Sequence, residues 1–220
     1  AQSAGSNYSR QVNTLIGTKG VGLTSGYLYP GATYPYGMVQ FTPSYFSKRS
    51  GFVINQLSGG GCEHMGNFPT FPVKGKLKMS PDNILNYRIN ISEEKGHAGY
   101  YEAMVQEDIK AKLTVTERTG MASYEYPADQ QYGTVIIGGG ISATPIEQAA
   151  IVITAPNKCE GYAEGGNFCG LRTPYKVYFV AEFDTDALES GTWKRNELKP
   201  NTTFAEGEYS GVYFTFDVNK

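Results

Sequence analysis

The sequence predicts an all-β fold, an antiparallel β-sandwich with few or no helices. Apolar residues recur at every second position in several short segments, which is the period of a half-buried strand. The chain is rich in Tyr (17) and Phe (11), which favour strands, and Gly (27) and Pro (11) supply many turns. No segment longer than a turn or two repeats its apolar residues with the 3.6-residue period of a helix.

The clearest alternation lies in residues 176–183, "KVYFVAEF". Its apolar residues share one face of the predicted strand: Val177, Phe179, Ala181 and Phe183. Residues 211–218 and 111–116 alternate in the same way, and Gly or Pro bounds the other predicted strands. A short helix over residues 146–150, "IEQAA", is the one helical segment that the pattern leaves open.

Composition excludes two classes of partner. The net charge is −2 and no run of Lys or Arg is present, whereas nucleic-acid binders carry a basic patch. No apolar run approaches the roughly 20 residues of a membrane-spanning helix. Residues 1–10, "AQSAGSNYSR", are small and polar, and we expect them to be the disordered start of a mature, exported chain.

The three cysteines leave two arrangements open. Cys159 and Cys169 are ten residues apart with glycines between them, so they could bridge a loop and leave Cys62 free. Sequence separation does not determine Cβ geometry, however, so the alternative without this bridge is equally compatible with the sequence.

Residues 55–72, "NQLSGGGCEHMGNFPTFP", concentrate glycines and reactive side chains. A metal site is disfavoured because three consecutive residues, Cys62 to His64, rarely converge on one ion. A Cys62 nucleophile with His64 as its base is less favoured still. A tight structural loop is the preferred reading of these residues alone.

Two other stretches have features of functional sites, but a structural interpretation is preferred for both. "IIGGGIS" (residues 136–142) has no Lys-Ser/Thr pair after its glycines, so a turn between strands is preferred to a phosphate site. In "EFDTD", Glu182, Asp184 and Asp186 alternate along a predicted strand, and a solvated face is preferred to a Ca²⁺ site or an acid–base pair.

Several motifs, in order along the chain, resemble the N-terminal β-sandwich domain of glycoside hydrolase family 92, the calcium-dependent α-mannosidases. They are "VNTLIGT" from residue 12, "YPGATYPYGMVQFTP" from 29, "GFVINQLSGGGCEHMGNFPTFP" from 51, "EKGHAGYY" from 93 and "LTVTERTGMASYEYP" from 113. The resemblance implies a galactose-mutarotase-like supersandwich over residues 11–220. It departs from the family at Asn55 and Gln56, where amides stand in place of imidazoles.

The resemblance also implies that catalysis and substrate recognition are shared between two domains. The catalytic carboxylates and the Ca²⁺ ligands of this inverting, exo-acting family lie on a C-terminal (α/α)₆ domain that this chain does not contain. The expected partners are that domain and a mannose-containing glycan, in a secreted, periplasmic or cell-surface setting. One wall of the active-site cleft would then be built by the loop residues Gly60, Gly61, Cys62, Glu63, His64 and Asn67. The same residues could instead pack the domain interface, and a stand-alone carbohydrate-binding module is the alternative function.

Overall fold

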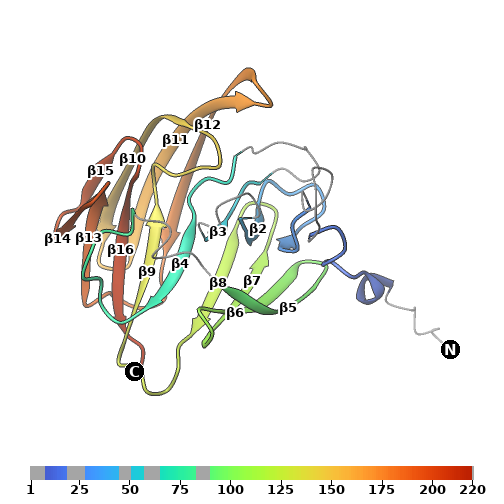
Figure 1. The fold of residues 1–220 in the computed structure, drawn as a ribbon, viewed down its shortest axis with the longest axis horizontal. Helices are drawn as coiled ribbons and strands as arrows, with labels where there is room; N and C mark the ends of the chain where they lie inside the picture. The colour runs from blue at the N-terminus through green and yellow to red at the C-terminus, as the bar shows by residue number, and fades with distance from the viewer. Residues whose placement is uncertain (1–7, 19–27, 45–50, 57–64, 83–89, 220) are drawn as a thin grey trace.

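The computed structural model describes residues 8–18, 28–44, 51–56, 65–82 and 90–219, and these form three antiparallel sheets (Figure 1). The central sheet has eight strands, in the order β1 (Ala32–Thr33), β2 (Gln40–Pro43), β3 (Phe52–Val53), β4 (Thr70–Lys74), β9 (Tyr132–Gly138), β16 (Ser210–Asp217), β13 (Glu189–Lys194) and β14 (Glu197–Pro200).

Two four-stranded sheets flank the central one. The first has the order β12 (Leu171–Glu182), β11 (Lys158–Phe168), β10 (Ile146–Ala155) and β15 (Phe204–Glu206). The second has the order β5 (Ile91–His97), β6 (Tyr100–Val105), β7 (Ile109–Val115) and β8 (Gly120–Glu125). One short 3-10 helix, η1 (Tyr8–Gln11), precedes the strands, and no helix among the described residues is long and apolar enough to span a membrane.

The middle strands of the central sheet, β9 and β16, are buried on both faces. Neighbouring residues on each of these strands belong to two different hydrophobic cores, one on either side of the sheet. On β9, Ile136 belongs to the core shared with β5–β8, whereas Ile137 belongs to the core shared with β10–β12 and β15. On β16, Tyr213 and Phe214 divide in the same way. Successive side chains of a strand point to opposite faces, so the fold is a three-layer β-sandwich. This confirms the predicted all-β class.

The alternation read from the sequence is confirmed in β12. Its inward-facing residues all pack against the second core: Val177, Phe179, Ala181 and, just past the strand end, Phe183. Strand β16 differs from the expected half-buried pattern, since Tyr213 and Thr215 are buried as well as Val212 and Phe214. The reason is its place in the middle layer, where both faces meet a core.

The short helix left open over residues 146–150 is wrong, because this segment begins strand β10 (Ile146–Ala155). The strand pairs with β11, but its register shifts between Ile146 and Gln148. Such a bulge interrupts the two-residue period of the side chains. The local apolar pattern is therefore too irregular to identify a strand by itself.

The "IIGGGIS" stretch is a turn, as predicted. Strand β9 ends at Gly138, and the backbone N–H groups of Gly139 and Gly140 both donate to the Ser210 carbonyl oxygen, at 2.9 and 3.0 Å. A Cβ atom on Gly140 would collide with the Gly207 carbonyl oxygen. Glycine is therefore required at position 140 by close backbone packing.

Truncation of the buried Phe214 to Ala should lower the free energy of unfolding by about 3–5 kcal/mol, since it opens a cavity in a fully enclosed core. The matched control is Phe204→Ala on β15, whose ring is 55% exposed and whose loss should cost less than about 1 kcal/mol. Urea denaturation of both variants measures the difference, and equal losses would contradict the three-layer description.

Candidate functional site

The loop of residues 55–72 is described only at its two stems. Gly60, Gly61, Cys62, Glu63 and His64 lie outside the described residues, so their predicted binding roles stay predictions. The stems themselves meet: Gln56 forms an antiparallel bridge with Met65, and the Gly66 N–H donates to the Asn55 carbonyl oxygen at 3.4 Å. The loop therefore leaves and re-enters the structure at one point, which we call the loop base (Asn55, Gln56 and Met65–Asn67).

Two buried amide side chains fasten the loop base. The Asn55 Nδ2 group donates to Asn67 Oδ1 at 2.9 Å, and the Asn67 backbone N–H donates to Asn55 Oδ1 at 2.7 Å. Both side chains are buried, so these bonds are shielded from water. Asn67, which was predicted to face the substrate, thus holds the base of the predicted wall.

Two further amide atoms of the loop base have no hydrogen-bond partner. They are the Asn67 Nδ2 donor and the Gln56 Oε1 acceptor, and both are buried. An unpaired buried polar group costs about 1–3 kcal/mol, so most buried groups are paired and each exception needs a reason. Both side chains are inaccessible to solvent, so any partner would have to reach them from within the protein.

The backbone of the loop base is strained. Met65 and Phe68 have φ angles of 58° and 54°, in the left-handed region that residues with a Cβ rarely occupy. Gly66 lies between them at 76°, where glycine is unstrained. Strain of this kind persists when surrounding packing enforces it, and it concentrates at ligand sites.

The packing that enforces this strain comes from the turn after β9 and from β12. The Met65 carbonyl oxygen accepts hydrogen bonds from the Ala143 N–H at 2.8 Å and from Ser142 Oγ at 2.7 Å. The Phe68 ring lies 4.0 Å, centroid to centroid, from the ring of Phe179. Segments more than 70 residues apart in the chain therefore fix the loop base.

The cysteines follow the arrangement without a Cys159–Cys169 bridge. Cys159 is free and buried in β11, so the Cys159–Cys169 bridge that the spacing left open is wrong. Cys169 is disulfide-bonded. Cys62 lies outside the described residues. Burial raises the pKa of the Cys159 thiol to about 12, so this side chain is not a nucleophile.

The three acidic residues of "EFDTD" are exposed to solvent, the interpretation preferred from the sequence. Glu182 ends β12 and pairs with Lys158 at 3.1 Å, while Asp184 and Asp186 are exposed in the following loop. No three His, Cys, Asp or Glu residues of the described segments come together as a metal site.

Two described carboxyl groups, Glu102 and Asp82, have shifted pKa values. Hydrogen bonding by Tyr100 lowers the pKa of Glu102, and Lys110 and Lys95 act in the same direction. Burial raises the pKa of Asp82, although the charge of Arg195 opposes the shift. Glu102 lies on β6, and its carboxylate is held as an ion by the Lys95 Nζ at 3.7 Å and the Lys110 Nζ at 3.8 Å.

Comparison with known proteins identifies the class. Residues 11–220 match the glycosyl hydrolase family 92 N-terminal domain, and the chain belongs to this family. An uncharacterised secreted glycosidase of Arthroderma benhamiae is 31% identical over 138 residues, which cover 54% of this chain and 17% of that protein.

Solved structures share the fold. An α-mannosidase of family 92 from Bacteroides thetaiotaomicron is 23% identical, with a TM-score of 0.78, and the match covers 95% of this chain and 31% of that one. An inverting mannosidase of the same family and species gives 24% identity and a TM-score of 0.79, covering 96% and 29%. The chain thus spans less than a third of the length of these relatives.

Asn55→Ala should destabilise the fold more than Asn67→Ala. The first change leaves the Asn67 N–H and Oδ1 newly unpaired, at a cost of about 2–3 kcal/mol. The second unpairs Asn55 Nδ2 but removes the Asn67 Nδ2 group that has no partner, so its net cost is about 1 kcal/mol. Urea denaturation tests the order, and the reverse order would refute the assigned amide orientations.

Alkylation should distinguish the free Cys159 thiol from the disulfide-bonded Cys169. Native protein at pH 8 should resist iodoacetamide at Cys159, because the thiol is buried and protonated. Denaturation without reductant should make Cys159 reactive, whereas Cys169 should be alkylated only after a reductant is added. Recovery of Cys159 in a disulfide would contradict the structure.

Proposed function

We propose that this chain is the N-terminal domain of a secreted, exo-acting α-mannosidase and that it is not catalytic alone. In this proposal the loop of residues 55–72 forms one wall of an active-site cleft. The observation that carries the proposal is the family match over residues 11–220, taken with solved relatives that are mannosidases and are about three times as long. The fungal relative, a secreted glycosidase, supports export.

The chemistry of sugar hydrolysis supports a catalytic centre elsewhere. An inverting glycosidase needs a general acid and a general base about 6.5–9.5 Å apart, with room for a water molecule between them. The solved relatives are about three times as long as this chain, and we assign the two carboxylates to a C-terminal (α/α)₆ domain, with the mannose-containing glycan bound between the two domains.

The role proposed for this chain is recognition. The buried side chains of Gln56 and Asn67 would support the wall from beneath and would not touch the sugar themselves. Glu63 and His64 would shape or polarise the rim, and the backbone of Gly60 and Gly61 would allow close approach of the sugar. Binding contacts of this kind orient the substrate and leave the bond-breaking step to the carboxylates.

Calcium is assigned to the C-terminal domain as well. The described part of the chain gathers no three carboxylate, imidazole or thiolate side chains, so its residues do not fit a dedicated Ca²⁺ site.

One observation favours a second function, carbohydrate binding by this domain itself. The outer face of β10–β12 and β15 carries a shallow groove of about 440 Å³, within the range of ligand sites. Tyr178 is 69% exposed there, its ring centroid lies 6.0 Å from that of Tyr162, and Glu160 supplies a carboxylate beside them. Exposed aromatic rings next to hydrogen-bonding groups suit sugars, which have apolar faces and polar edges.

The test compares the 220-residue chain with the longer parent polypeptide on mannose-linked disaccharides, with Ca²⁺ or with a chelator. We expect mannose release by the parent alone, and its loss on chelation. Release by the short chain would overturn the assignment of the carboxylates to another domain.

Calorimetric titration of the short chain with the same sugars tests the second function. Binding that Tyr178→Ala abolishes would establish a site in the groove. Absence of binding would leave the enzyme-domain proposal alone. Arg172→Ala, six residues before Tyr178 on β12 and outside the groove lining, is the control variant.

A further inference from the structure

The turn between β1 and β2 presents three large side chains to solvent. Tyr34 is 50% exposed, Met38 is 67% exposed, and Tyr36 is fully exposed. Single exposed apolar residues are ordinary on a protein surface, but a contiguous group marks an interaction site. We call residues 34–38 the aromatic turn.

The aromatic turn is held in a strained shape. Tyr36 has a φ angle of 61°, although it carries a bulky side chain, and the Gly37 N–H donates to the Tyr34 carbonyl oxygen at 2.9 Å. The Met38 N–H donates to the Glu117 carbonyl oxygen at 2.8 Å, which ties the turn to the β7–β8 connection. The turn therefore keeps a sparsely populated backbone conformation while the Tyr36 ring remains in water.

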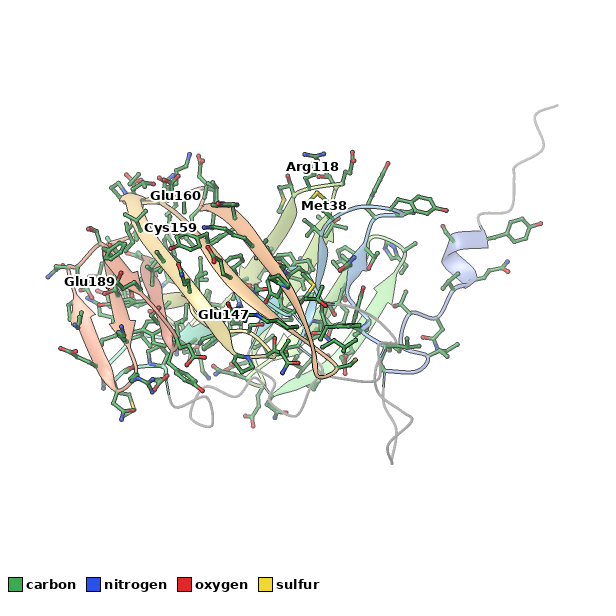
Figure 2. All side chains as sticks on the ribbon, turned by 90° about the horizontal axis from the view of Figure 1, so that it is seen from above. Met38, Arg118, Glu147, Cys159, Glu160 and Glu189 are labelled. Atoms are coloured by element: carbon green, nitrogen blue, oxygen red, sulfur yellow. The ribbon has the colours of Figure 1, made fainter. Side chains whose placement is uncertain are left out.

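A positive charge borders the turn. Figure 2 shows Arg118 beside Met38, and Arg118 forms no ion pair among the described residues. A guanidinium group next to exposed aromatic and thioether side chains has the composition of an interface hot spot. The complementary surface would carry apolar side chains and a carboxylate.

The aromatic turn is continuous with the loop base. Strand β2 begins at Gln40, two residues after Met38, and Gln40 forms a bridge with Asn55. The Gln40 N–H also donates to the Ile54 carbonyl oxygen at 3.0 Å. A partner seated on the turn would therefore stand directly beside the candidate site.

We propose that the aromatic turn, with Arg118, is the surface on which the remainder of the parent polypeptide docks. This inference rests on the proposed function, and the length of the solved relatives supplies the partner, since this chain covers only 29–31% of them. A second copy of the chain fits less well. A two-fold contact through this turn would bring two Arg118 side chains together, and like charges at an interface are unfavourable.

Methionine oxidation by dilute peroxide tests the docking without requiring activity. Met38 should be oxidised about tenfold more slowly in the parent polypeptide than in the 220-residue chain, because oxidation follows exposure. Met79 is the internal control. Met79 is 55% exposed and lies far from the aromatic turn. The next residue, Ser80, donates a hydrogen bond to the Arg195 carbonyl oxygen at the β13–β14 edge of the central sheet, and β1 and β2 lie at the opposite edge. The oxidation rate of Met79 should be the same in both proteins.

Tyr36→Gly provides the second measurement. Glycine accepts the positive φ, so the variant of the short chain should melt a few degrees higher. In the parent, the same change should restore fast oxidation of Met38. Equal oxidation rates of Met38 in the 220-residue chain and in the parent, both without the Tyr36 substitution, would overturn the proposal. Protection of Met38 that increases with the concentration of the 220-residue chain would indicate a dimer and would overturn it as well. If Met38 is protected in a parent polypeptide that lacks mannosidase activity, the docking proposal stands and the proposed function fails.

Discussion

Burial of the central sheet on both faces is the constraint on which the rest of the structure depends. Strands β9 and β16 lie in the middle layer, and each must supply side chains to two cores at once. One polar element within this layer is fully paired: Thr134 donates to the Gly75 carbonyl oxygen at 2.6 Å, and its Oγ lies 2.8 Å from that of Thr215. The threonines give the middle strands a fixed register in an otherwise apolar environment.

The candidate site is a consequence of this layer. The loop base lies immediately before β4 and is covered by the turn that leaves β9, so two neighbouring central strands hold it from both sides. The aromatic turn lies just before β2 at the same end of the sheet order. Rigid strands thus carry strained, polar connections, which is the usual way in which a β-scaffold builds a binding surface.

The sequence predicted the parts of this structure that depend on local pattern. Alternation identified β12, and the glycines of residues 138–140 identified a turn. It could not predict which strands are central, because that depends on pairing between distant segments, and β16 therefore proved more buried than its pattern suggested. The bulge in β10 hid a strand, and cysteine spacing suggested a bridge that the fold does not make.

The candidate site, like the fold, could be predicted from the sequence only in part. The family motif directed attention to the loop and to Asn67, but the Asn55–Asn67 clamp joins residues twelve positions apart through side chains that no period relates. Only the folded stems reveal that the loop base holds two unpaired amide atoms, and only the backbone angles reveal the strain at Met65, Phe68 and Tyr36. These features arise from tertiary packing, which overrides local preference at such positions.

The central claim is that this domain contributes contacts to a sugar site completed by another domain. A crystal structure of the parent polypeptide with a bound sugar-mimicking inhibitor tests it most directly. The account predicts that at least one group of residues 55–72 lies within hydrogen-bonding distance of the inhibitor. An inhibitor bound without contact to any residue of this chain would contradict it.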